Sequence, residues 1–395
     1  MAQSLFRAFR PLLCAAAVAF AAIAFAPQAD AHAYSAAYNT LTLAKSQTEM
    51  TYALDELSAI ELAGGDANGD KMLDQEEFDA VKDELADILR AHLTLKLGGE
   101  ETPWTSLERF VLVREGDASK VVLRALYPPA APSQSISLTD RLYENDTATN
   151  YVDLLTIRYG PQKSTSALSG KDRAWAMQLT DGDYAGLPEK AGETASASGD
   201  APGEEPAASA SGTGSGWLSF FKLGIRHILG GYDHLLFLFS LLIARQTFRQ
   251  YAAMITAFTV AHSLTLTLTV LGLLNVPPQI VEPAIALSIC YVALDNILRP
   301  RVSYRWVLTF LFGLVHGMGF ADILKEMEIP RSELAVNLIS FNLGIEAVQL
   351  TIVALLVPLL YALHRYKHAR RFVVAASVAA LALGGAWLFE RLFAA

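Results

Sequence analysis

Six ionisable residues lie within stretches that otherwise have the apolar composition of lipid-spanning helices. They are His227, Asp233, His234, His262, His316 and Glu346. An ionisable side chain deep in a bilayer is costly, so it usually faces a partner, an ion or a water-filled cavity. Imidazole and carboxylate groups are common ligands of divalent transition metals. We therefore predict that these residues converge on one nickel, cobalt, zinc or copper ion, the alternative being that each bonds two helices together.

The first of these stretches has the densest group of polar residues, from His227 to His234. Residues seven apart return to the same face of a helix, so His227 and His234 should project together about two turns apart. Asp233 lies on an adjoining face and could orient an imidazole. Gly230 and Gly231 permit close helix approach or a local break in the helix.

Composition supports a membrane domain, because the chain is 52% hydrophobic and only 18% charged, with a mean hydropathy of +0.30. Six segments are each near the roughly 20 residues that a helix needs to cross a bilayer. The predicted spans are Trp217–Ala244, Ala252–Leu274, Gln279–Leu298, Trp306–Leu324, Leu334–Leu363 and Phe372–Phe389. We expect an all-α domain of six transmembrane helices over residues 217–395.

Basic residues gather in the loops after the first, third and fifth predicted spans. They are Arg245, Arg249, Arg299, Arg301, Arg305, Arg365, Lys367, Arg370 and Arg371. Cytoplasmic loops carry an excess of Lys and Arg, so these loops should be cytoplasmic and both termini should lie outside. This orientation predicts a multi-pass protein of the bacterial inner membrane with a periplasmic N-terminal part.

Residues 1–31 have the three parts of a secretory signal peptide. Arg7 and Arg10 precede a short apolar segment, and Ala29-Asp30-Ala31 is an A-x-A cleavage site. The alternative is a retained membrane anchor, although the apolar segment is short for a span. The following residues, 32–215, are rich in acidic side chains, which excludes a basic nucleic-acid-binding surface.

Residues 32–98 are expected to be helical, with an acidic loop between helices at Ala53–Leu62 and Glu76–Leu95. The loop, residues 66–77, resembles the calcium loop of an EF-hand, in which six positions supply oxygen ligands. Those ligands would be Asp66, Asn68, Asp70, the Met72 carbonyl, Asp74 and Glu77. Lys71 replaces the usual glycine and must adopt positive φ, which should weaken calcium binding. The alternative is an acidic, solvated helix–turn–helix.

Residues 99–182 change to a strand-like pattern. Apolar and β-branched runs occur at Phe110–Val113, Val121–Tyr127 and Tyr151–Ile157, separated by turn residues. They predict a small β-sandwich of structural or binding role. Residues 183–216 are dominated by small and polar residues and are expected to form a disordered linker. The predicted fold class is thus multi-domain: an exported α and β-sandwich module, then the membrane helices.

Several of these motifs carry a family resemblance. Residues 227–234 resemble the H-P-x-x-G-x-D-H motif of the HupE/UreJ family, and Val315-His316-Gly317 resembles its F-H-G motif. Residues 258–263 and 341–346 are similar to the family's larger branch, whose members carry a signal peptide and an extracytoplasmic domain. The chain departs from the family at Ile228, which replaces proline, and at 319–321, where a glutamate is expected. The resemblance implies nickel or cobalt permease-like proteins that serve hydrogenase and urease.

Three functions remain open from the sequence. The first is a permease, or metal-delivery accessory protein, with the metal ion as substrate and a periplasmic metal-delivery protein as partner. The second is an intramembrane metal-dependent hydrolase, in which the bound metal activates water. The third is a calcium-stabilised membrane scaffold. We favour the permease, because the chain has no zinc-protease or nucleophile motif.

Overall fold

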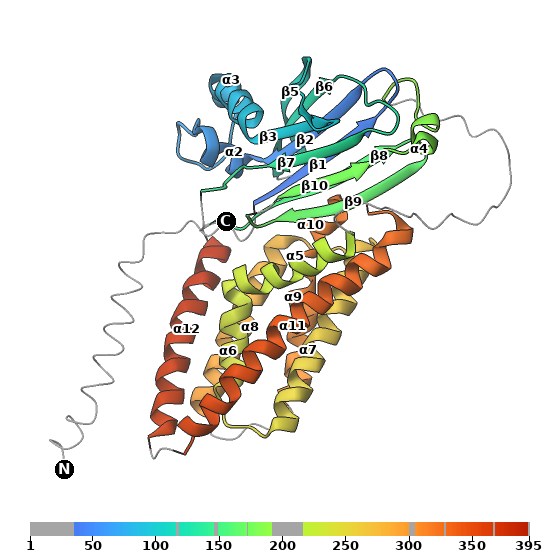
Figure 1. Ribbon diagram of the computed structural model, residues 1–395. Coiled ribbons are helices and arrows are strands. Elements are labelled where there is room, and N and C mark those ends of the chain that lie inside the picture. The colour runs from blue at the N-terminus through green and yellow to red at the C-terminus, as the bar shows by residue number, and fades with distance from the viewer. Residues whose placement is uncertain are drawn as a thin grey trace, which may run out of the picture. The chain divides into compact units, whose positions relative to one another are not determined.

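The computed structural model describes residues 35–115, 118–145, 149–171, 173–191, 216–299, 305–327, 329–365 and 368–393. The expected signal peptide and most of the expected linker lie outside these residues. The described residues fall into two compact units. One is drawn from His32–Leu223 and Glu326–Phe341, and the other from Gly224–Lys325 and Asn342–Ala395. The first contains a β-rich domain and the second a bundle of helices (Figure 1).

The β-rich domain is built from two sheets. Its strands are β1 (Ser35–Leu43), β2 (Thr48–Asp55), β3 (Leu93–Leu97), β4 (Glu100–Glu101), β5 (Ser106–Glu115), β6 (Ala118–Tyr127), β7 (Ser135–Asp140), β8 (Tyr151–Tyr159), β9 (Gln162–Ser169) and β10 (Ala174–Gln178). One sheet has the order β5-β6-β2-β1-β8-β9, and the other has the order β10-β7-β3-β4. All neighbouring strands are antiparallel except β1 and β8, which are parallel.

The expectation that residues 32–98 form a separate helical segment is wrong. β1 and β2 lie in the centre of the six-stranded sheet, and β3 belongs to the other sheet. Their side chains alternate between buried and half-buried positions, as strands require, but many are alanine or threonine and the apolar pattern is weak. The three apolar runs predicted as strands do lie in β5, β6 and β8.

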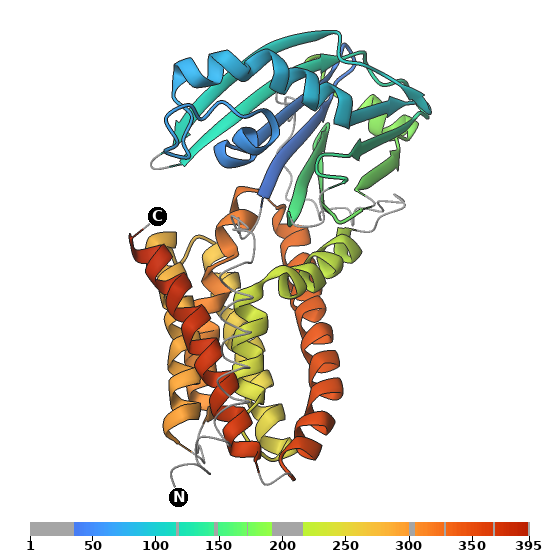
Figure 2. The ribbon, with the colours of Figure 1, turned by 90° about the vertical axis from the view of Figure 1, so that its left-hand side faces the viewer.

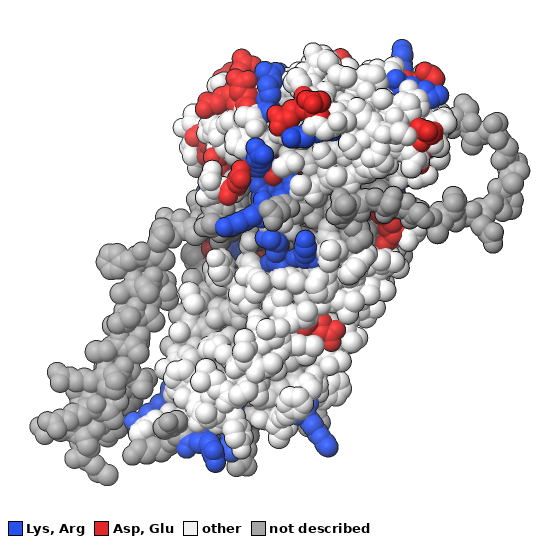
Figure 3. Space-filling view, viewed as in Figure 1, with Lys and Arg blue, Asp and Glu red and all other residues white. Residues whose placement is uncertain are grey.

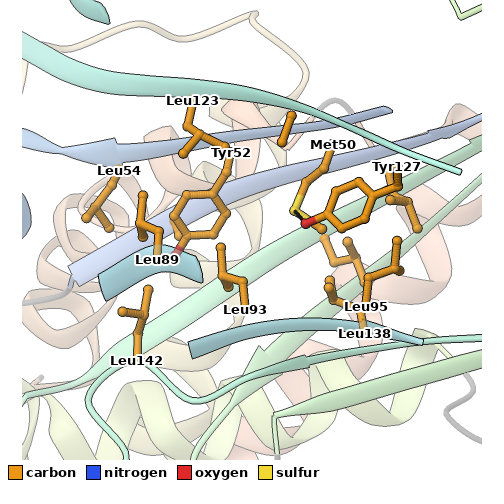
Figure 4. Packing of buried hydrophobic residues seen from close by; sticks show 14 of the residues in the cluster. Met50, Tyr52, Leu54, Leu89, Leu93, Leu95, Leu123, Tyr127, Leu138 and Leu142 are labelled. Atoms are coloured by element: carbon orange, nitrogen blue, oxygen red, sulfur yellow. Dashed lines mark hydrogen bonds between the residues drawn. The ribbon is translucent and has the colours of Figure 1, made fainter. Parts of the chain in front are cut away.

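The core of this domain lies between the two sheets. Met50, Tyr52 and Tyr127 of the six-stranded sheet face Leu95 and Leu138 of the other sheet (Figure 4). The Tyr127 hydroxyl donates a hydrogen bond to the Met50 sulfur over 3.7 Å. The domain continues beyond the expected start of the linker, through the short helix α4 (Asp181–Ala185) and the buried Leu187.

A buried polar cluster interrupts the apolar core. The Tyr151 hydroxyl donates to the Asp140 carboxylate over 2.5 Å and lies 2.5 Å from the Tyr52 hydroxyl. The Asn39 amide donates to Asp153 over 3.3 Å. Burial raises the pKa of Asp140 to about 6, and burial together with the Asp140 charge raises the pKa of Asp153. Both carboxyl groups therefore keep their protons to a higher pH than an exposed aspartate does.

We expect Asp140 to make this domain less stable as the pH rises from about 4 to 6. A pKa that is higher in the folded state means that the folded state binds the proton more tightly, so its stabilising effect disappears as the group ionises. Urea unfolding of the full-length protein in detergent at pH 4.5 and 7 measures this effect. In Asp140→Asn, the difference in unfolding free energy between these two pH values should be smaller by roughly 2 kcal/mol. The same difference in the variant as in the wild type would contradict the prediction.

Two helices flank the acidic loop of this domain. α2 (Glu56–Ala63) and α3 (Gln75–His92) are shorter than expected, because residues 53–55 belong to β2 and 93–95 to β3. Lys71 has a φ of 64°, the positive value that the sequence predicted. The loop residue Leu73 is fully buried, and Phe78 packs edge-on against Phe110 of β5.

The helical part contains α5 (Gly216–Gly230), α6 (Tyr232–Leu242), α7 (Phe248–Val270), α8 (Pro278–Leu298), α9 (Arg305–Met318), α10 (Ala321–Glu326), α11 (Arg331–Leu363) and α12 (Ala369–Phe393). Among the described residues, four of these helices are long and apolar enough to cross a membrane: α7, α8, α11 and α12. α6 and α9 are apolar but have only 11 and 14 residues. The direction of the chain changes between α5 and α6, where the first predicted span is broken (Figure 2).

Charge is distributed unevenly over the protein surface. In Figure 3, charged side chains of both signs are spread over the β-rich domain, whereas the flank of the helical part is mostly uncharged.

One arginine expected in a loop is instead buried: Arg305 begins α9 and donates to Asp295 of α8 over 3.1 Å. A buried charge needs such a partner, and this pair ties α9 to α8.

Candidate metal centre

Two histidines come together where α5 ends and α6 begins. Gly231 lies between the helices with φ −80° and ψ 89°, outside the helical conformation. A Cβ atom there would lie 2.8 Å from both the His227 carbonyl oxygen and His234 Nδ1, so only glycine fits without displacement. In a continuous helix the two histidines would be separated by about 10 Å along the axis. The break instead brings their ring centroids to 4.7 Å.

α7 supplies the third histidine. His262 is completely buried, and its ring centroid lies 6.0 Å from that of His227 and 6.3 Å from that of His234. One ligand nitrogen from each ring lies within 4.8 Å of the other two. We call these residues, His227, His234 and His262, the histidine cluster. Three imidazoles on three helices form the kind of nitrogen donor set that suits nickel, cobalt, zinc and copper.

His316 of α9 lies beside the histidine cluster but is not part of it. Its ring centroid is 4.9 Å from that of His234, and its Nε2 is 3.0 Å from the Ser288 hydroxyl. Ser288 donates its own proton to the Ile285 carbonyl over 2.6 Å, which lets its oxygen accept from His316 Nε2–H. In that tautomer, the lone pair is on Nδ1. Because Nδ1 is buried without a hydrogen-bond partner among the described residues, it is a candidate fourth ligand.

Close packing of α9 on α7 holds His316 near the histidine cluster. A Cβ atom on Gly313 would lie 2.7 Å from the Phe258 carbonyl oxygen, and one on Gly317 would collide with the His262 carbonyl. Glycines four residues apart let two helix backbones approach closely within a membrane. These two glycines thus fix the separation of the helices that carry His262 and His316.

The two predicted carboxylate ligands lie outside the histidine cluster. Asp233 accepts a hydrogen bond from Arg391 of α12, with 2.7 Å between Nη2 and Oδ2. Glu346 is half-buried on α11 and is not among the residues that form the cluster. Of the six residues predicted to converge, the structure brings His227, His234 and His262 together and places Asp233 in an ion pair.

A pocket adjoins the histidine cluster. It is lined by His234 and mostly by apolar side chains of α6 and α7, including Phe237, Met254 and Phe258. Gln349 of α11 also lines it, is almost completely buried, and accepts a hydrogen bond from Thr259 over 3.1 Å. The pocket therefore runs from an imidazole into apolar surroundings that contain one amide group.

Three contributors to the site were not recognised as such in the sequence. Arg391 lies near the end of the last apolar segment, where a basic residue is ordinary. Gly313 precedes the motif that contains His316. Its role, which is to let α9 approach α7 closely, depends on the α7 backbone opposite it. Phe320 packs on His227 with 4.5 Å between ring centroids, in the segment where the family resemblance leads one to expect a glutamate.

Comparison with known proteins agrees with the resemblance. The family model described as HupE / UreJ protein matches residues 204–391, a little under half of the chain. The helical part of the chain therefore resembles the HupE/UreJ family. The HupE/UreJ match and the four apolar helices together make this chain a multi-pass membrane protein. A search of curated proteins finds no match.

Proposed function

We propose that this protein is a divalent transition-metal permease, or a membrane protein that delivers such a metal to other proteins. The observation that carries the proposal is the histidine cluster, three imidazoles with ligand nitrogens within 4.8 Å of one another inside a multi-pass membrane protein. The family resemblance supports a nickel- or cobalt-type ion as the substrate. A periplasmic protein that hands over the metal would be the natural partner.

The three histidines must move closer together to bind one ion. Ligands about 2.1 Å from a tetrahedral metal ion lie roughly 3.4 Å from one another. The three imidazoles would have to move inward by about an ångström to bind one ion. The break at Gly231 gives His227 and His234 the freedom for this movement, because the two residues lie on separate helices. His316 Nδ1 could complete a tetrahedral site.

The proposal includes six membrane crossings. α5 with α6, and α9 with α10, would each form one interrupted crossing, an arrangement that transporters use to expose helix ends and backbone to an ion. The basic residues after α6, α8 and α11 would then face the cytoplasm. Cleavage of the signal peptide near Ala31 would leave the β-rich domain in the periplasm, joined to the membrane helices.

We propose further that the loop at residues 66–77 binds calcium on the periplasmic side. Asp66 accepts hydrogen bonds from the Gly69, Asp70 and Lys71 amides over 2.7, 3.1 and 3.0 Å, which curls the loop around its acidic side chains. Glu77 closes the loop by accepting from the Ala67 amide over 3.0 Å. Oxygen donors in this order suit calcium.

Metal analysis of the purified full-length protein tests the main proposal. After equilibrium dialysis against nickel chloride and excess calcium, we expect about one nickel ion per chain, because imidazoles prefer nickel to calcium. The bound nickel should exchange readily with free nickel. An absence of nickel binding would contradict the proposal. A metal that survives purification and does not exchange would favour the intramembrane hydrolase.

A further inference from the structure

Arg391 forms an ion pair with Asp233, the carboxylate next to His234 of the histidine cluster. Asp233 immediately precedes His234 in the first turn of α6, and its Oδ2 is 2.7 Å from Nη2 of Arg391. Only 21% of the Asp233 side chain and 18% of the Arg391 side chain are exposed. The two charges are therefore shielded from water, and they interact more strongly than a surface pair would.

A second contact fixes the guanidinium of Arg391 in place. Nη1 donates to the Glu282 carbonyl of α8 over 3.2 Å, and Nε lies 3.8 Å from the Glu282 carboxylate. The Glu282 side chain is 52% exposed, so Asp233 is the better shielded of the two acids. Arg391 is thus held by α8 while it binds a carboxylate on α6.

The ion pair changes the chemistry available to a metal ion. Asp233 is the carboxylate nearest to the cluster in sequence. Phe320, which packs on His227, lies in the segment 319–321 that lacks the glutamate expected from the family resemblance. While Arg391 holds Asp233, the donors in the cluster are neutral imidazoles. A set of imidazoles favours nickel, copper or zinc, whereas carboxylate ligands favour harder ions such as manganese and magnesium.

We propose that Arg391 is a positioning residue that sets the metal specificity of the histidine cluster by withholding Asp233 from the ion. Loss of Arg391 frees a carboxylate beside His234 and makes the site acceptable to harder cations. This inference rests on the proposed metal-binding function. It adds a role for α12, which contributes no ligand of its own to the cluster.

The test compares nickel and manganese binding to the full-length protein in detergent. Arg391→Gln should raise the affinity for manganese at least about tenfold relative to nickel, because manganese prefers the carboxylate that the substitution frees. The double variant Asp233→Asn/Arg391→Gln should return to the wild-type preference, because it has no carboxylate to offer. Arg391→Lys, which keeps the charge, should shift the preference less than Arg391→Gln.

Arg370→Gln is the matched control. Arg370 is also on α12, but it binds the Asn296 and Ile297 carbonyls of α8, so its loss should not alter the preference. An unchanged nickel-to-manganese ratio in Arg391→Gln would overturn the inference while leaving the proposed function intact. Loss of both metals from a folded Arg391→Gln protein would also overturn it, since Arg391 would then support metal binding in general and not the choice between metals. A wild-type protein that binds neither metal would overturn the proposed function itself.

Discussion

His234→Ala should weaken nickel binding by at least about 100-fold. Replacement of a residue that merely orients a ligand typically costs about 10–100-fold, and His234 supplies a ligand nitrogen itself. It is also the residue best placed to bind together with either neighbour, since its ring centroid lies 4.7 Å from that of His227 and 4.9 Å from that of His316. Isothermal titration of the full-length protein with nickel measures the loss.

His368→Ala is the control for this experiment, because His368 is exposed and lies outside the histidine cluster. It should bind nickel as the wild type does. His234→Ala must elute as the same single species as the wild type in size-exclusion chromatography. Wild-type affinity in a folded His234→Ala protein would mean that these histidines only pack helices together.

Glu77→Gln should weaken calcium binding at least about tenfold, which corresponds to about 1.4 kcal/mol. Glu77 is the residue at the last loop position, which binds calcium through both carboxylate oxygens in an EF-hand. An amide keeps the shape of the side chain but removes its charge and one acceptor oxygen. Calorimetric titration of the full-length protein with calcium provides the measurement.

Glu76→Gln serves as a close control, because Glu76 is the exposed neighbour of Glu77 and is not at a ligand position. It should bind calcium almost as the wild type does. Equal losses in the two variants would show that general negative charge, rather than the loop, attracts calcium. Nickel binding should be unaffected in both variants, since the histidine cluster lies in a different unit of the chain.

Sequence reasoning found the histidine cluster because an imidazole within an apolar stretch is itself informative. A break at Gly230 and Gly231 was one of two possibilities that the sequence offered, the other being close helix approach. The positive φ of Lys71 was predicted from its position in the EF-hand-like loop. Sequence reasoning could not foresee that the break brings His227 and His234 to one another from separate helices. It also assigned Asp233 to the metal, because the partner that holds this residue lies 158 positions further along the chain.

In the β-rich domain too, the sequence could not predict features that depend on contacts between distant residues. β5, β6 and β8 were predicted because they are rich in branched and aromatic residues. β1 and β2 were missed because alternation of alanine and threonine with larger residues is a weak signal without the neighbouring strands. Their place in the centre of the sheet is decided by pairing with β6 and β8, which are distant in sequence.

Nickel uptake into proteoliposomes tests the central claim most directly. Vesicles that contain the wild-type protein should accumulate nickel faster than protein-free vesicles, and the rate should saturate as external nickel increases. Vesicles with His368→Ala should behave as the wild type, whereas His234→Ala and His262→Ala should reduce uptake to the protein-free rate. Uptake by either cluster variant at the wild-type rate, or no uptake by a wild-type protein that binds nickel, would contradict the permease.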